Sequence, residues 1–261
     1  MPFAAGLYYE VHGPEDAPPL ILSSGLGGSA NYWKPNIPAV AEHYRVIAYD
    51  HRGTGRSDRA LPDVVTVDHF ADDILLLMDA LGIPKAHIIG HAAGGVAGLA
   101  LALKAPERLD RLVVVNGWVT ADPHFLRCFE ARLNLLRHSG AEAFLRAQPM
   151  FLYPAPWISE HSAALDAEVP HQIADFPGAA TMEKRIAALA AFDASDWIDA
   201  LDGQILALSA ADDMLVPWTC SSALVAASPA VTQRNLEYGG HACNVTDPET
   251  FNRIVLDFLR S

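Results

Sequence analysis

A glycine-flanked turn in the first half of the chain could carry hydrolytic chemistry. The segment I-I-G-H-A-A-G, residues 88–94, runs from an apolar stretch into small residues. Glycines at this spacing let a strand turn sharply into a helix and present the middle residue at the top of a sheet. In the pattern G-x-S-x-G that middle residue is a nucleophilic serine, but here it is Ala92. We therefore expect the turn to be kept and the serine nucleophile to be missing.

Two later segments supply an acid and a base. Asp213 lies four residues before Pro217 in a loop that follows an expected strand, and the neighbouring Asp212 is interpreted as a surface or turn residue. His241 follows a glycine pair after the last expected strand. Nucleophile position, acid and histidine thus come in the chain order of α/β-hydrolases. We predict that Asp213 orients His241, which acts as a general acid or base.

Two further segments fit the same arrangement. S-S-G-L-G-G-S, residues 23–29, follows an early strand, where a backbone amide would complete an oxyanion hole. The predicted donors are the amides of Leu26 and Ala93, and Ser24 stands where histidine is usual. D-H-R-G-T-G-R-S, residues 50–57, is predicted to form a structural turn beside that loop.

These segments need a sheet to bring them together. Short β-rich runs alternate with segments of helical period, which is typical of a mostly parallel sheet with helices on both faces. We expect one α/β-hydrolase domain over residues 1–261. The predicted strands are 7–11, 20–23, 45–49, 87–89, 112–115, 205–209 and 232–237, and the predicted core helices are 68–81 and 93–104.

The stretch between the strands at 112–115 and 205–209 is too long for a single crossover. We predict a mostly helical cap inserted at about 119–195, with helices near 127–139 and 182–192 and a turn-rich F-L-Y-P-A-P-W segment between them. Caps of this kind shape the substrate pocket and exclude water.

Composition limits the partners. The net charge is -13 with no cluster of Lys or Arg, so we expect no nucleic acid and no membrane surface as a partner. No apolar run reaches the roughly 18 residues of a membrane span and the first residues lack a signal-peptide pattern, which favours the cytoplasm. Neither the three cysteines nor the scattered histidines have metal-ligand spacing, so no metal and no cofactor is expected. The sequence leaves open whether the chain forms a homodimer.

Four segments resemble the RutD hydrolases of pyrimidine utilisation. They are V-N-G-W at 115–118, R-C-F at 127–129, A-Q-P-M-F-L-Y-P-A-P-W at 147–157 and G-G-H-A-C-N-V-T-D-P-E-T-F at 239–251. The similarity covers nearly the whole chain and includes the alanine of the elbow. It implies that Ala92 is native and that the chain hydrolyses carbamate, or alternatively 3-aminoacrylate, in uracil breakdown.

Both compounds are small anions, so a local cation should meet them in this acidic protein. The resemblance favours Arg127 of the R-C-F segment, whereas Arg132 and Arg137 are equally well explained as a solvated helix face. Trp118 and Ser24 are further candidates for substrate contact, and packing in the core is the alternative for Trp118.

Loss of a serine nucleophile lowers kcat by on the order of a millionfold, so an acyl-enzyme route is not expected. We predict instead that His241 and Asp213 activate a water or give a proton to the leaving nitrogen. Two alternatives stay open: a serine esterase or amidase present as its Ser-to-Ala variant, and a protein that binds a small ligand without turnover. Cys243 has no electropositive setting in the sequence that would make it a nucleophile.

Overall fold

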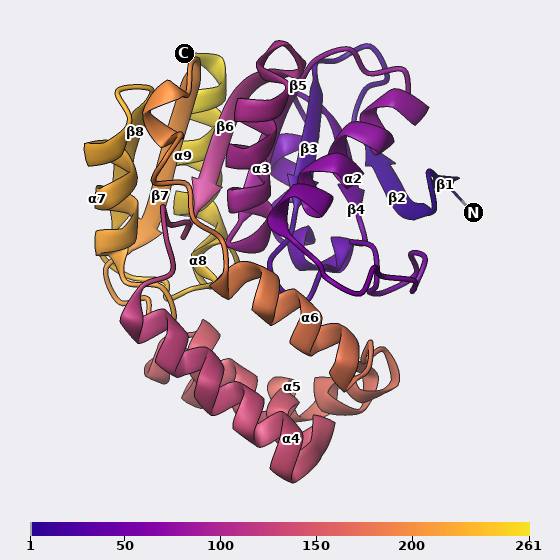
Figure 1. The fold of residues 1–261 in the computed structure, drawn as a ribbon, viewed down its shortest axis with the longest axis vertical. Helices are drawn as coiled ribbons and strands as arrows, with labels where there is room; N and C mark the ends of the chain where they lie inside the picture. The colour runs from indigo at the N-terminus through magenta and orange to yellow at the C-terminus, as the bar shows by residue number, and fades with distance from the viewer. Residues whose placement is uncertain (1) are drawn as a thin grey trace.

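The computed structural model describes residues 2–261, in which a twisted sheet lies between layers of helices (Figure 1). The strands are β1 (Phe3–Ala4), β2 (Leu7–His12), β3 (Pro19–Ser23), β4 (Arg45–Tyr49), β5 (Ala86–His91), β6 (Leu109–Val115), β7 (Gln204–Ala210) and β8 (Val231–Leu236). Within these residues they form one sheet in the order β1-β2-β4-β3-β5-β6-β7-β8. Pairing is antiparallel from β1 to β4 and parallel from β4 to β8. The predicted mostly parallel sheet is confirmed.

Helices cover both faces of this sheet. They are α1 (Ile37–Val40), α2 (Val67–Ala80), α3 (Ala93–Lys104), α7 (Trp218–Ala227), α8 (Cys243–Thr246) and α9 (Pro248–Arg260), with 3-10 turns η1 (Ala30–Trp33), η2 (Pro106–Arg108) and η3 (Ile198–Ala200). In β6, Leu112 and Val114 pack in the cluster that holds α2 and α3, while Val113 and Val115 pack in the cluster that holds α1 and α9. Successive side chains of a strand point to opposite faces, so a strand covered on both sides is apolar throughout.

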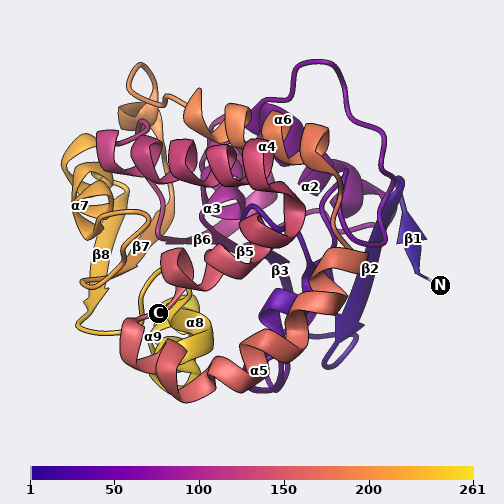
Figure 2. The same ribbon diagram turned by 90° about the horizontal axis from the view of Figure 1, so that it is seen from below.

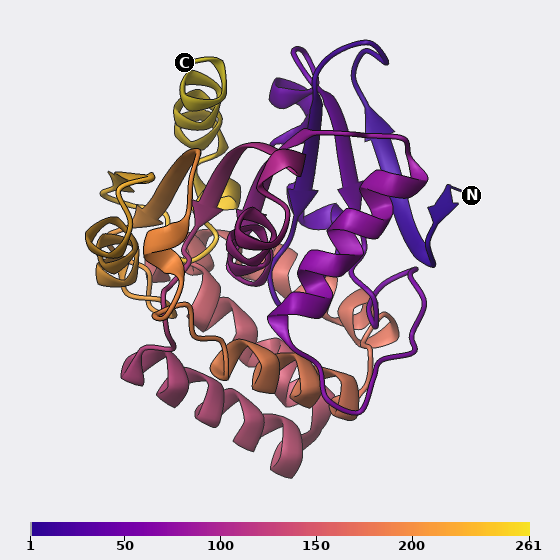
Figure 3. The same ribbon diagram turned by 45° about the horizontal axis from the view of Figure 1, so that its top comes forward.

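The cap consists of α4 (Pro123–Leu152), α5 (Ala155–Ala174) and α6 (Ala179–Ala190), inserted between β6 and β7. Its helices form a layer below the edge of the sheet to which the parallel strands point, at the end of the molecule opposite the C-terminus (Figures 1 and 3). Seen from below, the three helices lie across that edge (Figure 2). The cap therefore covers the ends of the strands, where the loops that carry the candidate site emerge.

The segment predicted to be turn-rich is mostly helical. α4 continues through Leu152, α5 begins at Ala155, and only Tyr153 and Pro154 separate them. Pro154 and Pro156 fit this arrangement because the start of a helix tolerates proline, which lacks an N–H there anyway. α4 is kinked at Gly140, whose φ is 85°. In residues 2–261 no helix is both long and apolar enough to cross a membrane.

Candidate functional site

The turn between β5 and α3 has the backbone of a nucleophile elbow. Ala92 adopts φ 46° and ψ -102°, a region that costs about 1–3 kcal/mol for a residue with a Cβ. The turn is held on both sides: the Ala92 amide donates to the Val115 carbonyl at 2.8 Å, and the Gly94 amide donates to the Ser24 carbonyl at 3.0 Å. A Cβ on Gly94 would lie 2.2 Å from the Ser23 carbonyl oxygen, so only glycine permits this approach. The chain thus keeps the strained backbone of the elbow although the residue at its tip has only a methyl side chain.

The structure brings together the acid and the histidine of the sequence pattern. Nδ1 of His241 lies 2.8 Å from Oδ2 of Asp213, and both side chains are buried. The other carboxylate oxygen accepts the amides of Leu215 at 2.7 Å and Val216 at 3.0 Å. A carboxylate only accepts, so Nδ1 of His241 carries a proton, and in the neutral imidazole the lone pair is on Nε2. Nε2 makes no hydrogen bond within residues 2–261, which leaves it for a reactant.

The backbone around His241 is also fixed. Its carbonyl accepts from Nε2 of His91 at 2.8 Å and from Nδ2 of Asn116 at 2.6 Å, and the His91 and His241 ring centroids are 4.6 Å apart. The Gly240 amide donates to Oδ1 of Asp212 at 2.8 Å, so this exposed residue orders the histidine loop. Burial holds the pKa of His91 well below its usual range, so His91 is a neutral donor. His241 is thus placed directly beside the elbow.

Two backbone amides remain available for a negatively charged oxygen. Within the described residues, neither the Leu26 amide nor the Ala93 amide has an acceptor. Leu26 lies in a turn closed by the Gly28 amide, which donates to the Gly25 carbonyl at 3.0 Å, and Ala93 begins α3 at the positive end of its dipole. A Cβ on Gly25 would lie 2.7 Å from Nδ1 of His91, so this loop passes close to the elbow. The arrangement can stabilise an oxyanion.

A buried arginine of the cap, which was not among the predicted site residues, holds the same loop. Arg185 of α6 is fully buried, and its Nε donates to the Leu26 carbonyl at 3.0 Å. Its two terminal nitrogens donate to the Arg52 carbonyl at 3.3 Å and to Nδ1 of His51 at 3.0 Å. Burial and the charge of Arg185 hold the pKa of His51 well below its usual range. Arg185 therefore links the loop at residues 23–29 to the loop at residues 50–57 by hydrogen bonds. It also fixes the peptide next to the predicted oxyanion donor.

Arg185→Met is expected to lower kcat by roughly tenfold. This loss is smaller than the roughly hundredfold or larger loss seen when an oxyanion donor itself is removed. The reason is that the Leu26 carbonyl loses its donor and the adjacent amide can turn away. Arg185→Lys should restore only part of the activity, because one ammonium cannot reach three acceptors. Initial rates give kcat and KM for both variants. A loss of unfolding free energy with an unchanged kcat would show that Arg185 only supports the fold.

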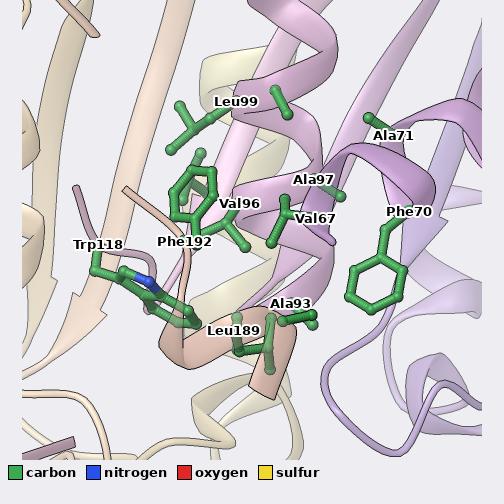
Figure 4. Close-up of a cluster of buried hydrophobic side chains, with 14 of the residues drawn as sticks. Val67, Phe70, Ala71, Ala93, Val96, Ala97, Leu99, Trp118, Leu189 and Phe192 are labelled. Atoms are coloured by element: carbon green, nitrogen blue, oxygen red, sulfur yellow. The ribbon is translucent and has the colours of Figure 1, made fainter. Parts of the chain in front are cut away.

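The three residues predicted to contact the substrate lie in different surroundings. Arg127 is exposed on α4 and has no hydrogen bond or ion pair among residues 2–261. The Ser24 hydroxyl and the Trp118 indole N–H are buried and lack partners in that same part of the chain. Trp118 packs in one apolar cluster with Ala93 of the elbow and Leu189 of the cap (Figure 4). The structure thus places Trp118 and Ser24 near the elbow and Arg127 at the surface of the cap.

Thiol chemistry finds no support in the structure. Cys128, Cys220 and Cys243 are free and buried, and burial raises the pKa of the Cys243 thiol far above its usual range. A thiol in this state is a poor nucleophile. Among residues 2–261, no group of three or more His, Cys, Asp or Glu side chains could hold a metal ion.

The free energy of unfolding should fall as the pH drops from 7.5 to 5.5. His51 and His91 are buried, which lowers the pKa of each well below the ordinary 6.5. Below that pH the unfolded chain binds protons at these positions and the folded chain does not, so stability is lost by up to about 1.4 kcal/mol per histidine per pH unit. Urea unfolding at several pH values measures this slope. A flat profile across this range would contradict the burial of two neutral histidines.

The chain is similar to known proteins in sequence and in fold. A family model described as the alpha/beta hydrolase fold matches residues 18–248. A RutD protein of Caulobacter sp. strain K31, provisionally named a carbamate hydrolase, is 52% identical over 97% of this chain and 96% of its own length. The RutD protein of Agrobacterium fabrum strain C58, named likewise, is 46% identical over 97% and 98%. The enol-lactonase of Burkholderia xenovorans LB400 matches the structure with a TM-score of 0.88 at 25% identity, over 99% of this chain and 98% of that one. The chain therefore belongs to the RutD family of hydrolases with the α/β-hydrolase fold.

Proposed function

We propose that this protein hydrolyses a labile C–N bond in a small carboxylate anion without forming a covalent intermediate, and that carbamate of pyrimidine breakdown is the substrate. The observation that carries the proposal is the buried Asp213–His241 pair beside an elbow whose tip is Ala92. The names of the RutD relatives support the choice of carbamate.

The proposed reaction converts carbamate and water into ammonia and carbon dioxide, the latter as bicarbonate. The oxygen of water goes to bicarbonate, and the nitrogen gains one proton as the C–N bond breaks. His241 supplies that proton from Nε2 or takes one from the attacking water, while Asp213 stabilises the imidazolium. The amides of Leu26 and Ala93 stabilise charge on the carboxylate oxygen. A positioned acid or base accelerates a reaction by about a hundred- to ten-thousandfold, which suffices for a compound that already decays in water.

The second candidate substrate is 3-aminoacrylate, which with water gives malonic semialdehyde and ammonia. In this reaction water adds to the carbon that carries nitrogen in the imine tautomer, and His241 moves the protons. The observation that favours it is Arg132, a buried cation of the cap with no ion-pair partner among residues 2–261. Such a cation offers the carboxylate a place away from the reacting carbon.

The experiment that tests the proposal compares freshly dissolved ammonium carbamate with freshly generated 3-aminoacrylate. Ammonia release and the carbon product are followed with and without protein. Acceleration with only one compound identifies the substrate, since bicarbonate and malonic semialdehyde are easily told apart. If neither reaction is faster than its spontaneous decay, the hydrolase proposal fails and a ligand-binding protein without turnover becomes the better explanation.

A further inference from the structure

The cap contains a buried positive charge that has no counter-ion within residues 2–261. Arg132 of α4 is 3% exposed, and no carboxylate of residues 2–261 lies within ion-pair distance of its guanidinium. Its one hydrogen bond is a long one, from a terminal nitrogen to Oε1 of Gln148 at 3.4 Å, and its Nε has no acceptor in the described chain. Arg137, further along the same helix, is exposed and pairs with Glu183 at 2.8 Å. Of these two arginines, it is therefore the buried Arg132 that has unused hydrogen-bond donors within the described residues.

Three aromatic rings surround this guanidinium. Its central carbon lies 5.3 Å, 5.1 Å and 5.5 Å from the ring centroids of Phe129, Phe144 and Phe151. Ring faces attract a cation but do not accept its N–H groups as a carboxylate does. Burial lowers the pKa of Arg132 to about 10, so the side chain is still charged at neutral pH. A buried charge is stabilised by pairing with an opposite charge, and residues 2–261 supply none to Arg132.

The surroundings of Arg132 are joined to both catalytic loops. One helical turn earlier, Sγ of Cys128 donates to the Met214 carbonyl at 3.7 Å, and Met214 directly follows the catalytic acid. Next to Phe151, the Leu152 carbonyl accepts the Ala242 amide at 2.9 Å, and Ala242 directly follows the catalytic histidine. The aromatic cage thus lies against the loops that carry Asp213 and His241, rather than at a distant part of the cap.

We propose that Arg132, inside the cage of Phe129, Phe144 and Phe151, binds the carboxylate of the substrate. The planar guanidinium can donate two parallel hydrogen bonds to the two carboxylate oxygens. The proposal rests on the proposed function for the identity of the substrate. The proposal also distinguishes the two candidate substrates. In 3-aminoacrylate the carboxylate is separate from the reacting carbon, so Arg132 can bind one while the other reacts. In carbamate the carboxylate carbon is itself the reacting carbon, so its oxygens would have to contact both Arg132 and the oxyanion amides.

The test uses Arg132→Met, Arg132→Lys and the matched control Arg127→Gln on the exposed face of the same helix. Methionine suits an apolar aromatic cage, so the variant should fold, which a near-UV circular dichroism spectrum checks. Binding of acetate is followed by NMR through the broadening of its methyl signal. We expect the native chain and Arg127→Gln to bind acetate equally, Arg132→Met to bind at least about tenfold more weakly, and Arg132→Lys to lie between them. Equal binding by the native chain and Arg132→Met would overturn the proposal.

Kinetics keep this proposal distinct from the proposed function. In Arg132→Met the KM for 3-aminoacrylate should rise at least about tenfold with kcat nearly unchanged, because the interaction is lost equally from the ground state and the transition state. Turnover that is insensitive to Arg132→Met would overturn the carboxylate site and leave the hydrolase intact. Acetate binding that depends on Arg132, in a chain that turns over neither substrate, would support the carboxylate site and overturn the proposed function.

Discussion

His241→Ala is expected to slow ammonia release by a factor of about a hundred or more, down to the spontaneous rate. The reason is that Nε2 of His241 makes no hydrogen bond within residues 2–261, while Nδ1 of the same ring is held by Asp213. His91 is not expected to replace it, because its Nε2 donates to the His241 carbonyl and its Nδ1 is buried against Gly25. KM should change little, since the lost interaction belongs to the proton transfer.

Asp213→Asn should come close to the same loss. The amide group of asparagine can donate to Nδ1 of His241, which would move the proton to Nε2 and remove the lone pair from the reactant side. In serine proteases this tautomer exchange lowers kcat by roughly ten-thousandfold. The matched control is Asp212→Asn, whose amide oxygen can still accept from the Gly240 amide. Equal losses in both variants would mean that loop order, and not the tautomer of His241, limits the reaction.

Ala92→Ser should create an esterase and weaken the native reaction. The elbow, the Asp213–His241 pair and the Leu26 and Ala93 amides have the arrangement that serves an acyl-enzyme, and only the hydroxyl is missing. Because a serine nucleophile is worth on the order of a millionfold in kcat, even poor alignment should raise hydrolysis of p-nitrophenyl acetate about a hundredfold. Ammonia release should fall, since the hydroxyl takes the space in which water would attack.

The control for this variant is Ala92→Gly, which relieves the positive φ without adding an oxygen. It should gain stability and show no esterase activity. Labelling by phenylmethylsulfonyl fluoride, followed by intact mass, reports whether the introduced hydroxyl is activated. An Ala92→Ser chain without esterase activity and with full ammonia release would show that the reaction does not take place at the elbow.

The strands and helices of the core could be predicted from the sequence because each kind of element has its own pattern of apolar residues. The apolar runs of β3 to β7 are continuous, as strands covered on both faces must be, and α3 was predicted within the bounds that the structure has. The short β1 was not predicted, because two residues carry no period. α5 was missed for another reason: it buries only Val169, so it has no apolar stripe to detect.

The pairing of Asp213 with His241 could be predicted because the order of the two residues along the chain is fixed by the order of the strands that carry them. The cations could not be ranked in this way. In α4 the buried positions Cys128, Phe129 and Leu136 recur at helical spacing, and Arg132 falls within that stripe while Arg127 lies outside it. The position of Arg132 inside an apolar stripe was the sequence signal that could have indicated its burial. Arg185 gave a weaker one, since it begins an apolar run in α6, and its role depends on contacts with loops more than a hundred residues away in the sequence.

The most direct test of a hydrolase without a nucleophile is a rapid-quench measurement with native protein in excess over substrate. Ammonia is quantified in the first turnover and the intact mass of the chain is recorded in the same samples. We expect ammonia release to exceed the spontaneous rate, to rise to a plateau with protein concentration, and to leave the mass of the chain unchanged. Release at the spontaneous rate at every protein concentration, or a covalent adduct that forms and decays with turnover, would contradict the account.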